Sequence, residues 1–301
     1  MLLTTIKDEY VFNCQCRKLS NKTIKNYSRQ IGYLLKWLEQ EKQITEIKYV
    51  TTSLIKEFLM KKRAEGITVN YFNDLLKAFK VYFRYAYEEN YTDKLLTDKI
   101  KNAKGEKVII RTFSDKELKR LLNYYQGHSY LQIRNKIIVY LFVDTGIRLS
   151  ELIELTEEQI KFDDYIIIKG KGNKERVVPK SPMLSKWLIK YMAVRKSFFQ
   201  YKNTPNNLLL SKNGKPMCTA MVDRIIKNAG AASDISKDIR VSAHTIRHTY
   251  AQYELKNGLD LYSLSRLLGH ENVSITQTYL NGMRDKEVLQ QAQKTSPLMN
   301  L

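Results

Sequence analysis

Cysteine and acidic residues are scarce in this sequence, and both shortages narrow the classes of protein that it fits. The 301 residues hold three cysteines, Cys14, Cys16 and Cys218. An odd count without framework spacing argues against a disulfide scaffold and favours a reducing cytoplasm. Aspartate and glutamate total 31 against 51 lysines and arginines, which leaves a formal net charge of +20. A charge of that size predicts a polyanionic partner, either nucleic acid or an anionic membrane surface.

Long apolar runs are also missing, which argues against the membrane alternative. The longest uninterrupted apolar stretch is Ile137 to Val143, far short of the ~20 residues that a spanning helix needs. Near the N-terminus, Lys7, Asp8 and Glu9 come too early for the apolar core of a signal peptide. We therefore expect a cytoplasmic protein without a membrane partner, and nucleic acid remains as the partner that the charge predicts.

The positive charge is spread over both halves of the chain. Residues 1–110 carry a net charge of +8 and residues 111–301 a net charge of +12. A basic tail would concentrate the excess at one end, whereas this distribution favours two modules that bind one polyanion.

Two predicted helices place their cations on a single face. A helix over about 20–40, with Ser20 as its N-cap, carries an apolar stripe at three- and four-residue steps, and a helix over about 69–88 repeats the pattern. The cations away from the two stripes are Lys22, Lys25, Arg29 and Lys36 in the first helix and Lys77, Lys80 and Arg84 in the second. Two such stripes favour contact with DNA phosphates, which position a protein without reading sequence. An ordinary solvated surface is the alternative.

The periodicity predicts a mainly α protein of two domains. Four helices, at about 3–15, 20–40, 52–65 and 68–90, form an N-terminal domain over residues 1–90, and the polar residues 91–113 form a linker. Residues 114–301 form the second domain, which opens on a capping box of Ser114 and Glu117. Further helices are predicted at about 131–144, 148–156, 181–198, 217–230, 244–257, 260–268 and 283–294. Segments 165–169 and 175–179, joined by a glycine-rich turn, predict a small antiparallel sheet in a mostly helical α+β domain.

Familiar nucleotide and metal motifs do not fit. The segment Gly170–Asn173 lacks the P-loop pattern and sits in a hairpin, so ATP use is not supported. His244 and His248 have a metal-ligand spacing on a helix, but Arg247 between them would oppose a dication, and no glutamate takes the general-base position. We therefore predict no metal and no cofactor.

The remaining candidates are cations, histidines and one tyrosine in the second half of the chain. They are Arg148 after a Thr-Gly helix end, Lys171 at the hairpin tip, His244 and Arg247 on one helix face, His270 after a glycine, and Tyr279. Taken singly, each has an ordinary structural interpretation. Together they meet the needs of phosphodiester chemistry, because arginine forks match the non-bridging oxygens of a phosphorane-like transition state. A histidine handles protons near neutral pH, and a tyrosine, unreactive at its free pKa of about 10, becomes a usable nucleophile among cations.

At these residues the sequence resembles the tyrosine recombinase (integrase) family, and most of all its compact Xer-type members. The segments TGIRLSEL, GKGNKERVVP, HTIRHTYA, LLGH and TQTY occur in the order and at the spacing of the family. Residues 1–90 resemble its helical, SAM-like core-binding domain. The resemblance implies a site-specific DNA recombinase that works through a 3′-phosphotyrosine intermediate, and that integrates or excises a mobile element or resolves dimers.

The resemblance also implies roles for individual residues. Tyr279 would be the nucleophile, Arg148 and Arg247 would clamp the scissile phosphate, and Lys171 would be the general acid for the leaving 5′ oxygen. The supporting set would be His244 for proton transfer, His270 for a hydrogen bond to the phosphate, and Glu151 for holding the region around Arg148.

Implied partners are double-stranded DNA with inverted half-sites and further protomers. Two sites would be held by a tetramer of this chain, or by a hetero-oligomer with a second recombinase. Residues 283–301 would form a C-terminal helix that docks on a neighbouring protomer, with packing on its own protomer as the alternative. Competing interpretations are a catalytically silent DNA-binding protein of the same fold, a type IB topoisomerase-like enzyme, and a nucleic-acid-binding module whose Tyr279 is merely buried.

Overall fold

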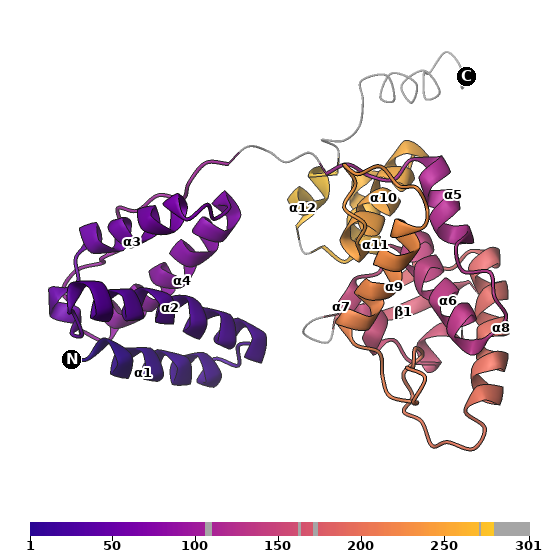
Figure 1. Ribbon diagram of the computed structural model, residues 1–301, viewed down its shortest axis with the longest axis horizontal. Helices are drawn as coiled ribbons and strands as arrows, with labels where there is room; N and C mark the ends of the chain where they lie inside the picture. The colour runs from indigo at the N-terminus through magenta and orange to yellow at the C-terminus, as the bar shows by residue number, and fades with distance from the viewer. Residues whose placement is uncertain (106–109, 162–163, 171–173, 271, 280–301) are drawn as a thin grey trace, which may run out of the picture. The chain divides into compact units, whose positions relative to one another are not determined.

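The chain folds into two compact units, each with its own hydrophobic core. The computed structural model describes residues 1–105, 110–161, 164–170, 174–270 and 272–279. The units span Met1–Lys107 and Val108–Leu301, and each is described separately below (Figure 1). The division into domains at 1–90 and 114–301 with a linker over 91–113 stays a prediction.

Residues 1–105 of the first unit form four helices and one short 3-10 turn. They are α1 (Leu3–Cys16), α2 (Asn21–Lys42), η1 (Ile47–Tyr49), α3 (Thr52–Ala64) and α4 (Val69–Glu88). Ser20, Thr51 and Thr68 each accept a hydrogen bond in their side chain from a backbone N–H of the first turn that follows, so α2, α3 and α4 each begin at an N-cap that the sequence supplies. The predicted cap at Ser20 is confirmed.

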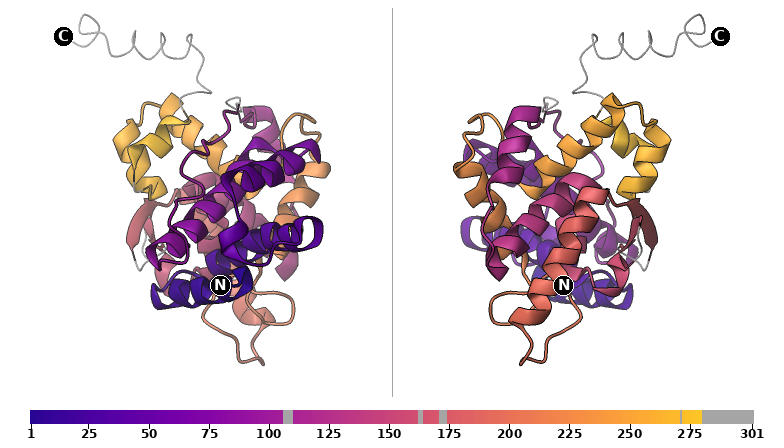
Figure 2. Two further views of the ribbon diagram at one scale, coloured as in Figure 1. Left: turned by 90° about the vertical axis from the view of Figure 1, so that its left-hand side faces the viewer. Right: turned by 90° about the vertical axis from the view of Figure 1, so that its right-hand side faces the viewer.

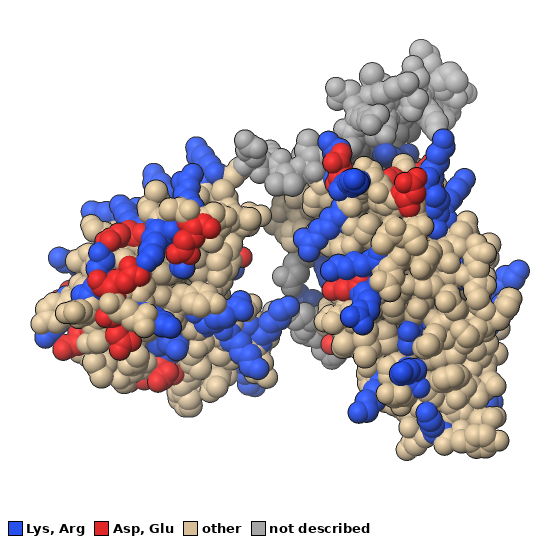
Figure 3. Space-filling view, viewed as in Figure 1, with Lys and Arg blue, Asp and Glu red and all other residues tan. Residues whose placement is uncertain are grey.

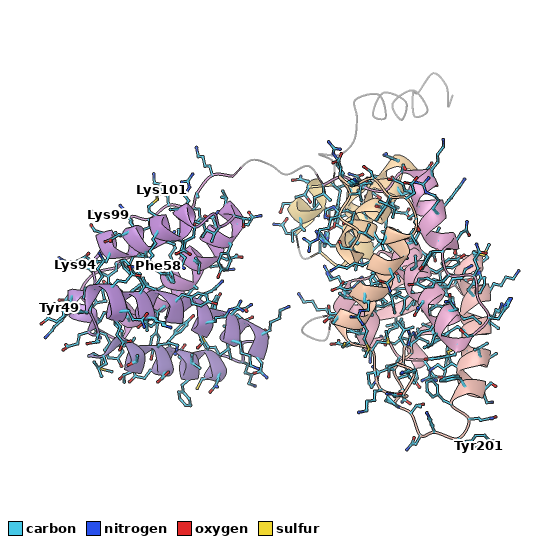
Figure 4. All side chains as sticks on the ribbon, in the orientation of Figure 1. Tyr49, Phe58, Lys94, Lys99, Lys101 and Tyr201 are labelled. Carbon is cyan, nitrogen blue, oxygen red and sulfur yellow. The ribbon has the colours of Figure 1, made fainter. Side chains whose placement is uncertain are left out.

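Aromatic side chains fill the core of the first unit. Phe58 lies between Trp37 and Phe79, with ring centroids 5.5 and 5.8 Å apart, and Figure 4 shows it among the helices. Leu96 and Ile100, from the segment predicted as a linker, are buried in this same core. Figure 4 also shows Lys94, Lys99 and Lys101 of that segment at the surface of the unit. The segment therefore covers one side of the first core with its apolar residues.

The second unit is built around α6 (Tyr130–Thr145). This helix is buried on most of its surface and packs against α5 (Asp115–Asn123), α8 (Pro182–Phe198) and α10 (Ala243–Lys256). The capping box predicted before α5 is confirmed, because the Ser114 backbone N–H donates to Glu117 over 2.9 Å. Among its described residues, the unit also contains α7 (Leu149–Glu154), η2 (Glu158–Ile160), α9 (Thr219–Ala231), α11 (Leu261–Leu268) and α12 (Val273–Gln277).

One small antiparallel sheet interrupts the helices of the second unit. Strand β1 (Tyr165–Lys169) pairs with β2 (Glu175–Pro179), in a register that runs from Tyr165 opposite Pro179 to Lys169 opposite Glu175. Alternate residues of the pair face the core, as a half-buried sheet requires. The predicted fold class, mainly α with a four-helix first domain and a small antiparallel sheet in the second, is confirmed.

The last described elements lie beside this sheet. Helix α11 packs against α10, α12 and β2, and Figure 2 shows the yellow segment of α11 and α12 next to the hairpin. The predicted helix at 283–294, and the whole segment 283–301, lie outside the described residues. Among the described residues, no helix is long and apolar enough to cross a membrane.

Candidate active site

Helix α10 carries a buried arginine at the centre of the site. Arg247 is 5% exposed, and its Nη1 donates to the carbonyl of Gly146 over 2.6 Å. Its Nη2 donates to the carbonyl of Leu268 over 2.7 Å and lies 3.1 Å from His270 Nε2. Burial, together with the neighbouring cation of Arg148, lowers the pKa of Arg247 to about 10. The guanidinium therefore stays charged at neutral pH and is fixed in place by carbonyl groups of two other segments.

The turn between α6 and α7 places a second arginine nearby. Gly146 ends α6 with a φ of +58°, and a Cβ there would lie 2.3 Å from the Tyr250 ring, so the tight turn requires glycine. Two residues later, Arg148 donates from its Nη1 to Glu151 Oε1 over 2.9 Å and from its Nη2 to the carbonyl of Gly269 over 2.9 Å. Unlike Arg247, this side chain is 38% exposed and can reach a ligand at the surface.

Glu151 holds two arginines at once. It accepts the backbone N–H and the Nη1 of Arg148. It also accepts both terminal nitrogens of Arg176, from strand β2, at 2.7 and 2.8 Å. Burial alone would raise the pKa of this carboxyl group, but the hydrogen bonds and charge of Arg176 and the bonds from Arg148 lower it to about 2. Glu151 is therefore an anion that fixes the positions of both arginines.

Three arginines meet at the C-terminal end of α11. Three successive carbonyl groups there each accept one hydrogen bond. The carbonyl of Leu267 accepts from Arg176 Nε over 2.8 Å, and that of Leu268 accepts from Arg247 Nη2 over 2.7 Å. The carbonyl of Gly269 accepts from Arg148 Nη2 over 2.9 Å. The carbonyl end of a helix carries partial negative charge and stabilises cations. The arrangement therefore brings the guanidinium groups of Arg148 and Arg247, which lie 99 positions apart in the sequence, onto adjacent peptide groups.

His270 follows directly after this helix end. Its Nε2 lies 3.1 Å from Arg247 Nη2, and its Nδ1 lies 2.8 Å from the hydroxyl of Thr276 in α12. Burial, followed by the cations of Arg247 and Arg148, lowers the pKa of His270 to about 4. The imidazole is therefore neutral at neutral pH and is bonded at both ring nitrogens.

The two histidines of α10 bond to each other. Their Nε2 atoms, in His244 and His248, are 2.9 Å apart. Burial lowers the pKa of both, in His248 to about 4. The four-residue spacing that resembles a metal-ligand pair therefore places two neutral imidazoles side by side, and one proton between their Nε2 atoms bonds them to each other. Among the described residues, no group of three or more His, Cys, Asp and Glu side chains is arranged to hold a metal ion.

Tyr279 lies against His248 and His270. Its ring centroid is 4.6 Å from that of His248 in an edge-on contact, and 6.0 Å from that of His270 with nearly parallel planes. The residue is 4% exposed and shares a small apolar cluster with Tyr250 and Leu268. The aromatic ring that the sequence proposes as nucleophile is thus next to the imidazoles of the site.

Lys171 lies outside the described residues, so the structure does not place it. The hairpin that carries it is described on both sides, up to Gly170 and again from Lys174. Arg176 connects this hairpin to the site through Glu151 and the carbonyl of Leu267.

Three polar residues of the site were missed by the sequence analysis: Arg176, His248 as a neighbour of Tyr279, and Thr276. Arg176 is one of 51 cations, and its carboxylate and carbonyl partners are far away in the chain. The signal that could have found Thr276 is its spacing, because it stands one helical turn before Tyr279.

The cationic stripes of the first unit are at its surface. Lys22, Lys25, Arg29, Lys36, Lys77 and Arg84 are exposed, and Lys80 is half-buried. Within the part of the chain that the structure describes, none of the seven forms an ion pair. Figure 3 shows Lys and Arg side chains on the visible face of both units.

The structure thus places two arginines on adjacent carbonyl groups and a tyrosine beside the neighbouring histidines, in a mostly helical unit that follows a four-helix unit. The chain belongs to the phage integrase family, because the sequence profile of that family matches residues 111–285, more than half of its length. The profile of the phage integrase N-terminal SAM-like domain matches residues 13–90. These matches confirm the resemblance seen in the sequence, and they make the chain a site-specific recombinase of the DNA-cleaving and rejoining type.

Individual relatives agree with this assignment. The chain is 30% identical to the tyrosine recombinase XerD of Staphylococcus haemolyticus over 284 residues, which cover 92% of this chain and 94% of that protein. It is 28% identical to XerD of Halalkalibacterium halodurans over 264 residues, which cover 87% and 88% of the two chains.

Solved structures share the fold. XerH bound to its palindromic difH substrate in a post-cleavage complex superposes with a TM-score of 0.73 at 21% identity, over 93% of this chain and 81% of that one. A lambda integrase dimer bound to a COC′ core site superposes with a TM-score of 0.74 at 20% identity, over 94% and 78%.

Proposed function

We propose that Tyr279 attacks a DNA phosphate held by Arg148 and Arg247 and so cleaves the strand. The phenol oxygen forms a bond to phosphorus, the bond from phosphorus to the 5′ oxygen breaks, and the product is a 3′-phosphotyrosyl ester with a free 5′ hydroxyl. Attack of a 5′ hydroxyl on this ester reverses the step and releases the tyrosine. One phosphate ester replaces another throughout, so the reaction needs no nucleotide cofactor.

The single observation that carries this proposal is the pair of arginines on adjacent carbonyls of α11. Arg148 and Arg247 donate to Gly269 and Leu268, and each guanidinium has more N–H donors than these bonds use. The remaining donors suit the non-bridging oxygens of a phosphate, where charge develops during attack. Because the arginines are held before DNA arrives, little reorganisation is needed at the moment of reaction.

Proton transfer is assigned to His244 and Lys171, as the family resemblance implies. His244, neutral because its pKa is lowered by burial and by Arg247, receives the phenol proton, and His270 contacts the phosphate. Lys171 protonates the leaving 5′ oxygen, a role that rests on the family resemblance alone. Glu151 holds Arg148 and takes no part in bond making.

Duplex DNA with inverted half-sites is the proposed partner. The exposed cations on α2 and α4 suit phosphate contact, and structural neighbours include recombinase dimers on DNA and a lambda integrase tetramer on a Holliday junction. We infer a tetramer of this chain on two sites, or a hetero-oligomer with a second recombinase, with the segment 283–301 docking between protomers. We also infer a location in the cytoplasm.

Trapping on a nicked suicide substrate tests the proposed chemistry. Cleavage next to the nick releases a short fragment, so the protein stays joined to DNA and migrates more slowly in a denaturing gel. We expect this adduct in the wild type and its loss in Tyr279→Phe, with duplex binding kept. The absence of an adduct in the wild type would favour a catalytically silent DNA-binding protein. Relaxation of supercoils without site preference would favour a topoisomerase.

A further inference from the structure

A line of hydrogen bonds connects the phosphate-binding arginine to the helix before the nucleophile. Arg247 Nη2 lies 3.1 Å from His270 Nε2, and His270 Nδ1 lies 2.8 Å from Thr276 Oγ1. Thr276 is fully buried, and its carbonyl accepts the backbone N–H of Tyr279 over 3.0 Å. Three side chains therefore join α10 to α12 at the position where the chain turns into Tyr279.

The chemistry of the first partner fixes the proton on His270. A guanidinium group has only donors, so His270 Nε2 must accept from Arg247 and carries no hydrogen. A neutral imidazole then holds its proton on Nδ1, and this N–H donates to the Thr276 hydroxyl oxygen. The alternative tautomer would set two donors against each other at Nε2 and leave Nδ1 as an acceptor.

We propose that Thr276 is a positioning residue that fixes the orientation of the His270 ring through Nδ1, so that the imidazole orients Arg247 and couples the nucleophile's helix to the phosphate site. This proposal rests on the proposed function, because the coupling matters only if Arg247 binds the phosphate that Tyr279 attacks. It also assigns His270 a role before DNA arrives, because its Nε2 is then an acceptor for Arg247. A hydrogen bond from this nitrogen to a phosphate requires the proton on Nε2, and the Thr276 hydroxyl, which both donates and accepts, holds the ring at Nδ1 in that state too.

A second threonine on the same segment provides a matched control. Thr278 is exposed, and its hydroxyl donates to the carbonyl of Ile275 over 2.7 Å. It has the same side chain as Thr276 and is even closer to Tyr279 in the sequence, but its hydroxyl is bonded to Ile275 and not to His270. Thr276→Val and Thr278→Val, made separately, each replace one hydroxyl group by a methyl group. Their comparison therefore distinguishes loss of the contact with His270 from a general effect of the substitution on this segment.

The tautomer is measured first, on the full-length protein labelled with ¹⁵N-histidine. Imidazole ¹⁵N shifts distinguish a protonated nitrogen from an unprotonated one, and the His270 signals are assigned by their loss in His270→Gln. In the wild type we expect a protonated Nδ1 and an unprotonated Nε2. In Thr276→Val we expect the Nδ1–H to lose its partner, so that its signal shifts and its proton exchanges faster with solvent; in Thr276→Ser we expect the wild-type signal to return, and in Thr278→Val to stay. A wild-type imidazole protonated at Nε2 alone would overturn the proposal without the need for any variant.

The functional effect is measured by single-turnover cleavage of the suicide substrate at saturating DNA. Loss of one hydrogen bond from a positioned group predicts that Thr276→Val cleaves about tenfold more slowly, with unchanged duplex affinity. Thr276→Ser should recover most of this rate, and Thr278→Val should match the wild type.

Three outcomes would contradict the coupling. They are a wild-type rate in Thr276→Val, a Thr276→Ser variant that stays slow although its His270 tautomer is normal, and an equal loss in Thr278→Val. If Thr276→Val does not fold, the serine variant and the wild-type tautomer still decide the question. A wild type that forms no adduct would refute the proposed function instead, and the tautomer measurement would still test the contact between His270 and Thr276.

Discussion

The two units carry the same kinds of cation in opposite settings. On α2 the side chains of Lys25, Arg29 and Lys36 are exposed and form no ion pair within the described part of the chain. In the second unit, Arg247 is buried and Arg176 is half-buried, and both are bonded to carbonyl groups or to Glu151. Exposed cations attract DNA whatever its base sequence, whereas guanidinium groups that are fixed in place stabilise the negative charge that develops on one phosphate. The comparison predicts that mutations in the first set alter binding and that mutations in the second set alter chemistry.

The largest effect should follow removal of a fixed arginine. Arg148→Ala and Arg247→Ala should each slow single-turnover cleavage by about 2–4 kcal/mol in activation free energy, as for the loss of one oxyanion donor. Duplex affinity should fall much less, because a single phosphate contact among many is lost. Arg266→Ala, an exposed cation of α11, is the control and should cleave normally. Equal losses in cleavage and binding would show that Arg148 and Arg247 only hold DNA.

Neutralising the shared carboxylate should disturb both arginines and the stability of the unit. The folded pKa of Glu151, about 2, lies below its ordinary value of 4.5. The charged group therefore stabilises the fold fully above pH 4.5, and this contribution, on the order of 3 kcal/mol, is lost as the pH falls toward 2. Glu151→Gln should lower the free energy of unfolding at pH 7 and flatten its pH dependence between pH 4.5 and 2.

Chemical denaturation at several pH values measures this effect. Glu175→Gln, in an exposed pair with Lys169 at 3.6 Å, is the control and should change stability little. An unchanged slope in Glu151→Gln would mean that this carboxylate does not support the arginines in the folded protein.

The smallest effects belong to the exposed stripe. Changing Lys25, Arg29 or Lys36 to alanine should weaken binding to any duplex and reduce the slope of log affinity against log salt by up to about one unit each. Cleavage at saturating DNA should stay the same. Lys62→Ala, which removes a cation already paired with Glu65 at 2.7 Å, serves as the control. An unchanged slope of log affinity against log salt would indicate that these side chains form an ordinary solvated surface and do not contact DNA.

Local signals in the sequence were sufficient for most of the fold. The cap at Ser20, the capping box at Ser114 and the strands around the glycine-rich turn all depend on residues that are close in the chain. The apolar stripes of α2 and α4 predicted the buried faces for the same reason. Such features are predictable because periodicity and capping chemistry act over a few residues.

The site was predictable only in its residue types. The sequence pointed to Arg148, Arg247, His270 and Tyr279 as a set. The two arginines, however, are joined by backbone carbonyls at the end of α11, and a carbonyl has no sequence signature. Arg176 was missed for this reason. The four-residue spacing of His244 and His248 is also typical of metal ligands, so the sequence alone did not indicate that the two rings bond to each other. The structure shows this bond.

The most direct test of the central claim is to identify the residue that carries the DNA. After suicide-substrate trapping and digestion with nuclease and protease, mass spectrometry locates the phosphotyrosyl linkage among the 20 tyrosines of the chain. The account predicts a 3′-phosphoryl nucleotide on Tyr279 and on no other residue. A linkage at any other tyrosine would contradict the assignment of these arginines and histidines to the reacting phosphate.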